Sequence, residues 1–231
     1  MPAAGPVDGA DEFYGTPALS RVRDYSAAGV RASLEDSLRR LRLDRVDLAL
    51  IHDPDDFMTE ALDSAYPALA ELRAAGVVGA IGVGMNAAAP LAWFASRADL
   101  DCVLVAGRYS LLDQSAGAEL LPLCAERRVR VLAGGVFNSG ILADPRDGAR
   151  YDYAPAPPAL LARARRIRDV CAAYGVPVAA AALQFTLRHP AVTAAVVGAR
   201  SPAEITADAS YLSLGIPDEL FTALAAVKPF E

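Results

Sequence analysis

The sequence predicts an α/β protein with a parallel sheet, because short apolar runs alternate with longer helical patterns along the chain. The runs are rich in β-branched residues and almost continuously apolar, as expected of strands covered by helices on both faces. Five such strands are predicted, at residues 46–51, 77–83, 102–106, 129–133 and 192–197.

Helices are predicted before the first strand and between the later ones. Segment 33–41 starts at Ser33, has acidic residues in its first turn and ends in arginines, which suits capping and the helix dipole. Gly76 and Gly175 stand where helix C-terminal stops are expected. The further helices are predicted at 65–75, 90–95, 116–127, 158–173, 177–188, 202–212 and 218–227.

Two stretches rich in glycine and proline are predicted to be loops, at residues 1–24 and 143–158. Residues 1–20 are expected to form a flexible N-terminal segment and residues 21–231 a single domain. The second loop is long for an α/β connection, and loops of that kind often cover a ligand.

Composition excludes several classes of protein. With 231 residues and 54% hydrophobic side chains, the chain can bury a large core without disulfides or metals. A net charge of −6 argues against nucleic acid as a partner. Three widely spaced cysteines, no signal peptide and no apolar run of membrane-spanning length lead us to expect a cytoplasmic protein without a membrane partner.

Polar and glycine-rich residues follow each predicted strand. In parallel sheets and barrels the carboxyl ends of the strands meet at one edge, where ligands bind. Glycine-rich ends on the last two strands, each followed by a helix start, suit a phosphate group. One site is therefore predicted, formed by the segments 52–55, 84–86, 107–110, 134–140 and 198–201.

Together these segments resemble the aldo-keto reductases, in the branch of bacterial L-fucose, D-threo-aldose and pyridoxal dehydrogenases. The resemblance runs from about residue 20 to residue 228 and is specific because the motifs occur in one order. They are Asp24-Tyr25-Ser26, the segments 33–38 and 43–47, His52-Asp53-Pro54-Asp55, Gly82-Val83-Gly84-Met85-Asn86, Gly107-Arg108-Tyr109, Asn138-Ser139-Gly140 and Val197-Gly198-Ala199-Arg200-Ser201.

The resemblance implies a (β/α)8 TIM-barrel type fold, of which this chain carries about five of the eight β/α units, so residues 21–231 are expected to be a partial, N-terminally truncated barrel. It also implies hydride transfer between NAD or NADP and a sugar, aldehyde or alcohol substrate. Open edges of such a partial barrel would favour self-association.

The resemblance assigns roles to individual residues. His52 corresponds to the active-site histidine that hydrogen-bonds the substrate oxygen, and Tyr109 to the tyrosine under the nicotinamide. Asn86 lies near the carboxamide position. A pyrophosphate loop is implied at Phe137, Asn138, Ser139 and Gly140, and an adenosine segment at Gly198, Arg200, Ser201, Glu204 and Asp208. Arg200 and Ser201 would hold a 2′-phosphate, whereas Glu204 would bond a ribose hydroxyl, so NAD and NADP both remain open. No metal ligand is predicted.

The family's catalytic Asp, Tyr and Lys would precede residue 20, and neither Tyr14 nor Tyr25 replaces the tyrosine. Activity of the chain is therefore open, and a catalytically dead dinucleotide-binding or interaction module is an alternative. A second alternative is a Rossmann-type dehydrogenase, because residues 82–87 fit G-x-G-x-x-A. A metal hydrolase built on His52, Asp53 and Asp55 is weaker, because His189 is the only other histidine.

Overall fold

A computed structural model describes residues 22–227, so the predicted flexible segment 1–20 lies outside the described residues. The elements are α1 (Ala27–Leu41), β1 (Val46–His52), η1 (Asp55–Phe57), α2 (Met58–Glu60), η2 (Ala61–Ala65), α3 (Tyr66–Ala74), β2 (Val78–Met85), α4 (Ala88–Arg97), β3 (Cys102–Ala106), η3 (Ser115–Gly117), α5 (Leu120–Arg127), β4 (Arg130–Gly134), β5 (Arg150–Tyr151), β6 (Ala154–Pro155), α6 (Pro158–Ala173), α7 (Val178–Leu187), β7 (Val192–Val196), α8 (Pro202–Tyr211) and α9 (Asp218–Ala225).

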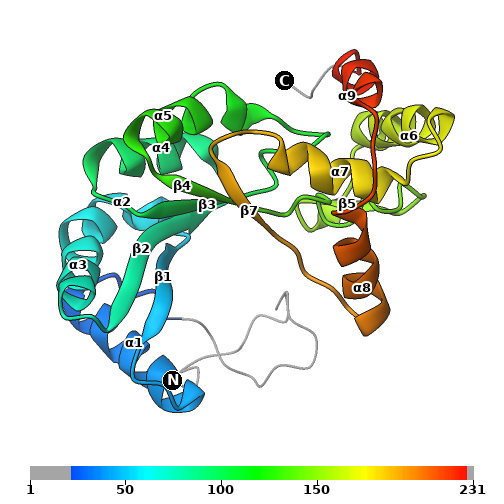
Figure 1. The fold of residues 1–231 in the computed structure, drawn as a ribbon. Helices are drawn as coiled ribbons and strands as arrows, with labels where there is room; N and C mark the ends of the chain where they lie inside the picture. Colours follow the sequence, from blue (N-terminus) through cyan, green and yellow to red (C-terminus); the bar gives the residue numbers. More distant parts are fainter. Residues whose placement is uncertain (1–21, 228–231) are drawn as a thin grey trace.

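Five parallel strands form one sheet in the order β1-β2-β3-β4-β7, which confirms the predicted fold class. Helices cross between neighbouring strands, as parallel pairing requires. Figure 1 shows a curved sheet with α1, α3, α4 and α5 along its convex side and α6 to α9 beyond β7. Among residues 22–227, β1 and β7 each pair with one strand only, so the barrel is not closed there.

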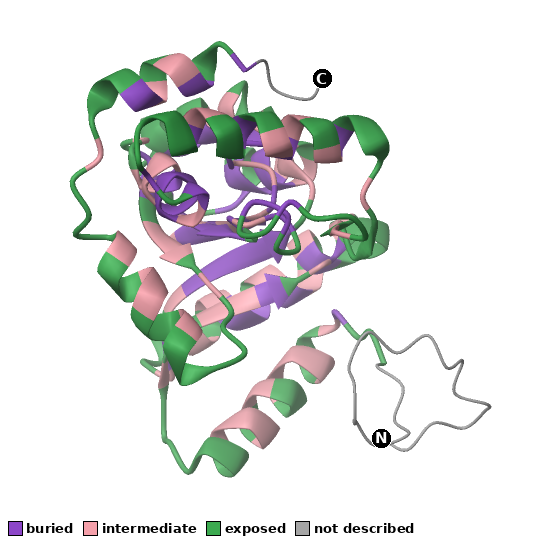
Figure 2. Cartoon of the chain, turned by 90° about the vertical axis from the view of Figure 1, so that its right-hand side faces the viewer, coloured by how far each residue is buried: buried purple, intermediate pink, exposed green. Residues whose placement is uncertain are grey.

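Two hydrophobic cores position the elements. The first lies between the sheet and its outer helices and includes Ile81, Val83 and Phe94, each at most 1% exposed. The second lies under α6, α7 and α9 and holds Ile141 and Leu142, which anchor the chain just after β4. Figure 2 shows the buried residues concentrated in the central strands and on the inner sides of the helices around them.

The two outer strands differ from the sequence prediction. Their apolar runs predict cover on both faces, yet Leu48 of β1 is 37% exposed and Val196 of β7 is 46% exposed. The reason is positional, because each strand has a sheet neighbour on one side only within the described residues. Apolar composition therefore marks these segments as strands without ensuring their burial.

The G-x-G-x-x-A pattern lies in a strand rather than in a phosphate-binding turn. Gly82 and Gly84 both belong to β2, where they pair with residues of β1 and β3. A Cβ on Gly82 would lie 2.3 Å from the carbonyl oxygen of Cys102. The glycine therefore permits close approach of two strands, and the Rossmann interpretation is wrong.

Three local predictions need correction. Helix α1 begins six residues before Ser33, because the Ser26 side chain accepts a hydrogen bond from the Gly29 N–H at 3.1 Å and caps the helix. The predicted helix 65–75 is preceded by further helical turns from Asp55 onward, including a π-turn at Ala61–Ala65. Within the predicted loop 143–158, β5 and β6 form a short antiparallel ribbon.

Among the described residues, no single helix is long and apolar enough to cross a membrane. The α6–α7 pair, bent by 97°, meets the length and composition requirement only when both helices are taken together. No group of three His, Cys, Asp or Glu side chains within residues 22–227 is arranged to hold a metal ion. His52, Asp53 and Asp55 therefore do not form a metal site.

Candidate functional site

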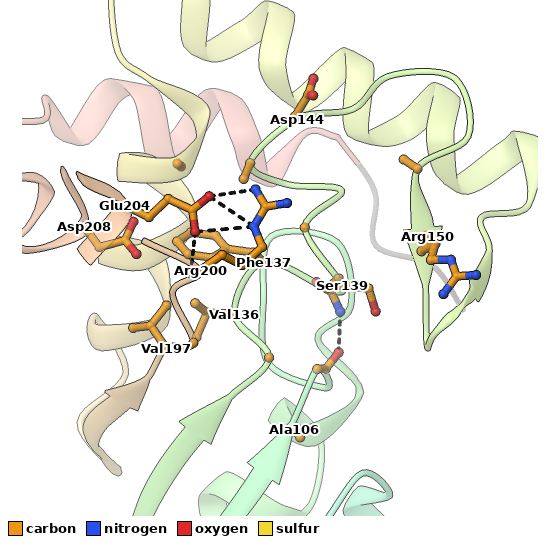
Figure 3. Close-up of a pocket in the computed structure, with 18 of the residues that line it drawn as sticks. Ala106, Val136, Phe137, Ser139, Asp144, Arg150, Val197, Arg200, Glu204 and Asp208 are labelled. Carbon is orange, nitrogen blue, oxygen red and sulfur yellow. Dashed lines mark hydrogen bonds and ion pairs between the residues drawn. The ribbon is translucent and has the colours of Figure 1, made fainter. Parts of the chain in front are cut away.

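A cavity of about 900 Å³ lies at the carboxyl ends of β3, β4 and β7. Its walls come from the loop after β4, the β5–β6 ribbon and the segment that leads from β7 into α8, as Figure 3 shows. This is the edge at which ligands bind in parallel α/β folds. Nine of the twelve site residues predicted from the sequence line it: Asn86, Phe137, Asn138, Ser139, Gly140, Gly198, Arg200, Glu204 and Asp208.

The loop after β4 is shaped by Asn138. Its side chain is 3% exposed, accepts a hydrogen bond from the Ser110 hydroxyl at 2.6 Å and donates one to the Gly107 carbonyl at 2.8 Å. Asn138, Ser139 and Gly140 all have positive φ, which turns the backbone sharply at the cavity. The Asn138 amide thus holds the loop against the end of β3, and Ser139 and Gly140 are left on its exposed rim.

The segment after β7 forms the opposite wall. The Ser201 hydroxyl caps α8 by accepting from the Glu204 N–H at 3.2 Å, and Ser201 itself does not line the cavity. The Arg200 guanidinium binds the Glu204 carboxylate, with its shortest contact at 2.7 Å, and the Arg200 backbone N–H donates to the same carboxylate at 2.7 Å. This ion pair lowers the pKa of Glu204, so the carboxylate is ionised at neutral pH.

Helix α8 lies at the surface, and Tyr211 at its C-terminal end packs, partly buried, against both hydrophobic cores. None of its residues is buried. The Gln184 amide on α7 donates hydrogen bonds to the carbonyls of Tyr211 and Leu214, at 2.6 and 2.7 Å, just where α8 ends. Gln184 therefore fixes the helix that carries Glu204 and Asp208.

Tyr109 lies outside the cavity. Its half-buried ring packs against Phe185, with centroids 5.4 Å apart, and edge-on to His189 at 5.6 Å. Burial raises the pKa of its hydroxyl. These contacts account for the placement of the ring without a ligand, so its predicted role under a nicotinamide stays a prediction.

His52 also lies outside the cavity, at the end of β1. Its imidazole is 77% exposed, with Nδ1 at 3.4 Å from a carboxylate oxygen of Asp53. His52 pairs with Gly84, two residues before the cavity residue Asn86. The buried Tyr25 hydroxyl contacts the carbonyls of His52 and Asp53, each at 2.8 Å, and burial raises its pKa. Tyr25 therefore anchors the backbone that presents the histidine.

Replacing Tyr25 by phenylalanine is expected to lower the free energy of unfolding by about 1 kcal/mol, because one buried hydrogen bond is lost while the ring contact with Phe57 remains. Urea denaturation would measure the change. Tyr66→Phe serves as the control, since the Tyr66 hydroxyl accepts only an exposed bond from the Asp99 N–H and water replaces it. Equal stability of the Tyr25→Phe variant and the parent chain would contradict the anchoring role.

The β5–β6 ribbon contributes cavity residues that sequence reasoning did not single out, among them Arg150 and Tyr153. The ribbon is tied to the end of β3 by Arg108, whose guanidinium binds both carboxylate oxygens of Asp152 at 3.1 and 2.6 Å. The Tyr151 hydroxyl donates to Asp113 at 2.9 Å, and burial together with that carboxylate raises its pKa. The only sequence signal for these residues was the expectation that the predicted loop 143–158 covers a ligand.

The comparisons with known proteins agree on one family. The model of the aldo/keto reductase family matches residues 18–229. The chain is 43% identical over 225 residues to D-threo-aldose 1-dehydrogenase from Pseudomonas sp., which covers 96% of this chain and 68% of that relative. It is 42% identical to pyridoxal 4-dehydrogenase from Microbacterium luteolum, over 97% of this chain and 69% of the relative.

Solved structures show the same fold. An aldo-keto reductase from Bacillus halodurans in its holo form superposes with a TM-score of 0.75 at 23% identity, over 90% of this chain and 71% of that one. A glycerol dehydrogenase from Gluconobacter oxydans gives a TM-score of 0.71 at 24% identity, over 91% and 68% of the two chains. The fold is thus of the TIM-barrel type. With the family match and the two relatives above 40% identity, this chain belongs to the aldo/keto reductase family of NAD(P)-dependent oxidoreductases.

Proposed function

We propose that the cavity binds the nicotinamide dinucleotide, with the pyrophosphate at the loop after β4 and the adenosine at the N-terminal half of α8. The observation that carries this proposal is that both glycine-containing strand ends open into one cavity of about 900 Å³. That volume is in the upper range of small-molecule sites. The N-terminus of α8, which is ten residues long, adds a helix dipole that favours a phosphate.

The residues present fit such a ligand. Gly140 and Gly198 both line the cavity, and a Cβ on either residue would meet no atom within 4 Å. The backbone at both positions therefore faces open space. Arg150 brings a positive charge to the ribbon wall, and among residues 22–227 no acidic side chain pairs with it. Open backbone and a guanidinium together suit the two negative charges of a pyrophosphate.

When bound, the dinucleotide supplies the hydride that is exchanged with the substrate. The role proposed for His52 is to donate a hydrogen bond to the substrate oxygen, with Asp53 orienting the imidazole from 3.4 Å. The Tyr25 hydroxyl is directed at backbone carbonyls, and residues 22–227 contain no lysine, so the described residues leave the proton donor unassigned. We propose a small sugar or aldehyde as substrate, by analogy with the relatives named for aldose and pyridoxal oxidation.

Dinucleotide binding is expected to raise the melting temperature by roughly 5–11 °C at a ligand concentration of 100 Kd, because this stabilises the folded state by about 2.7 kcal/mol. Differential scanning fluorimetry with NAD and NADP would measure the shift. Gly198→Val is expected to abolish the shift in melting temperature, because the valine side chain would occupy the cavity beside the backbone of residue 198. Gly215→Val is the matched control, since that glycine also has open space around it but lies outside the cavity.

The absence of a shift with either dinucleotide at millimolar concentration would refute the binding proposal. A shift without turnover of a D-threo-aldose or of pyridoxal would instead support the alternative of a catalytically silent dinucleotide-binding module. The two outcomes separate binding from chemistry.

We further propose a reducing compartment, the cytoplasm, as the place of action. Cys102, Cys124 and Cys171 are buried free thiols, and burial raises the pKa of each to about 11, which keeps them protonated and unreactive. Self-association through the edges of β1 and β7 stays a prediction, as does the division into a segment 1–20 and a domain 21–231.

A further inference from the structure

The turn between β5 and β6 holds two residues in a backbone conformation that favours glycine. Tyr151 pairs with Ala154, so Asp152 and Tyr153 form a two-residue hairpin loop, with φ of 48° and 64°. Loops of this kind usually carry glycine at the second position, because a side chain there strains the backbone. The Tyr153 side chain is therefore held at the tip of the ribbon against a local preference of the backbone.

Packing does not explain why a tyrosine occupies this position. Tyr153 is 65% exposed and, among the described residues, belongs to neither hydrophobic core, whereas Tyr151 packs against the second core. Tyr153 nevertheless lines the cavity. An exposed aromatic side chain in a cavity wall offers a ligand a flat apolar surface. The position of the ring thus indicates contact with a ligand.

The turn is fixed at both of its residues. The Arg108 guanidinium binds both carboxylate oxygens of Asp152, at 3.1 and 2.6 Å. The Tyr153 N–H donates a hydrogen bond to the Ser139 hydroxyl, on the loop after β4, at 3.3 Å. A ring that a fixed backbone presents has less freedom to lose when a ligand stacks on it.

The ribbon tip lies toward the ends of β2 and β3, away from α8. A Cβ on Gly107, the residue after β3, would lie 4.0 Å from the Asp152 carboxylate. Gly107 and Asn86 both line the cavity, and Asn86 follows by two residues the β2 residue that pairs with His52. Figure 3 shows the ribbon on the right of the cavity and α8 on the left. Tyr153 therefore belongs to the end of the cavity nearer His52, where the proposed dinucleotide leaves room for a substrate.

From this placement we propose that Tyr153 stacks on the ring of an aromatic substrate and is a specificity-determining residue of the site. The inference rests on the proposed function, because the substrate exchanges its hydride with a dinucleotide in the same cavity. A planar ring gains dispersion contacts over the whole tyrosine face, whereas an open-chain aldehyde or alcohol covers little of it. The tyrosine hydroxyl takes no part in such stacking.

Pyridoxine tests the inference without turnover, because it carries the ring of pyridoxal but no aldehyde that could react with an amine. Isothermal titration calorimetry on the whole chain, saturated with the dinucleotide that gives the larger thermal shift, would measure its affinity. Tyr153→Ala is expected to weaken binding about fivefold, and Tyr153→Phe to leave it within about twofold. Tyr174→Ala is the matched control, because Tyr174 is an exposed tyrosine at the end of α6 and outside the cavity.

Tyr153→Gly separates contact with a ligand from a structural role. Glycine adopts the positive φ of this turn without strain, so the variant is expected to melt at a temperature no lower than that of the parent chain. Its affinity for pyridoxine should nevertheless fall as far as that of Tyr153→Ala. A lower melting temperature would show that the ring stabilises the ribbon, which contradicts the inference.

The remaining outcomes distinguish the inference from the proposed function. Pyridoxine binding that is absent from the parent chain, or unchanged in Tyr153→Ala, would overturn the inference while a thermal shift with the dinucleotide leaves the proposed function intact. Loss of that thermal shift in Tyr153→Ala would also overturn it, because the ring would then contact the dinucleotide. A parent chain that shows no thermal shift would overturn the proposed function and the inference with it.

Discussion

Replacing Asn138 by alanine is expected to lower the free energy of unfolding by about 3 kcal/mol and to weaken dinucleotide binding at least tenfold. The variant removes the short bonds to the buried Ser110 hydroxyl and the Gly107 carbonyl, which keep only longer contacts, to the Asp113 carbonyl at 3.4 Å and to Arg108 Nη1 at 3.5 Å. It also places alanine at a φ of 45°, which asparagine tolerates better. Urea denaturation and calorimetric titration with the dinucleotide would measure the two effects.

Ser139→Ala is the matched control for Asn138→Ala. Ser139 also has positive φ, at 57°, but its side chain is exposed and accepts only a bond from the Tyr153 N–H at 3.3 Å. A loss below about 1 kcal/mol is expected for it. If the two variants were equally stable, the buried amide would not be what holds the loop after β4.

Gly82→Ala is expected to destabilise the sheet by about 3 kcal/mol or more, at the upper end of overpacking effects. Its Cβ would lie 2.3 Å from the Cys102 carbonyl oxygen, and a backbone atom cannot move aside without separating β2 from β3. Gly84→Ala in the same strand is the control, because its Cβ would meet Leu104 at an ordinary 3.6 Å. Thermal unfolding would rank the pair, and equal melting temperatures would show that the strands can separate at no cost.

Much of the fold could be predicted because strands and helices leave local signals. The run 102–106 is reproduced without change as β3, and 158–173 as α6, since apolar runs and Pro158 define their limits. The start of α1 was missed because Ala27 and Gly29 carry no helical hydrophobic pattern, although Ser26 is a good cap. The β5–β6 ribbon was missed because its turn, Asp152 and Tyr153, adopts positive φ without glycine or asparagine.

The candidate site also contains some residues that could be predicted from the sequence and others that could not. Strand-end position predicted that Asn138 to Gly140 and the residues from Gly198 to Arg200 would meet at one site, because parallel topology brings those ends together. Glu204 and Asp208 were expected from the family resemblance. The sequence could not predict that the Asn138 amide turns into the protein or that Tyr109 packs on Phe185, because both contacts depend on long-range packing. Helical spacing did not predict the Arg200–Glu204 pair, because Arg200 precedes the N-cap Ser201 and lies outside α8.

The surface position of α8 bears on how a ligand leaves. Outward motion of this helix uncovers the Tyr211 side chain, which is partly buried against both hydrophobic cores, and breaks the two hydrogen bonds of the Gln184 amide. Such an opening costs far less than unfolding the sheet. The loop after β4, anchored in the core by Ile141 and Leu142, keeps its shape meanwhile. We therefore expect release of the adenosine end of the proposed dinucleotide to depend mainly on the outward motion of this one surface helix.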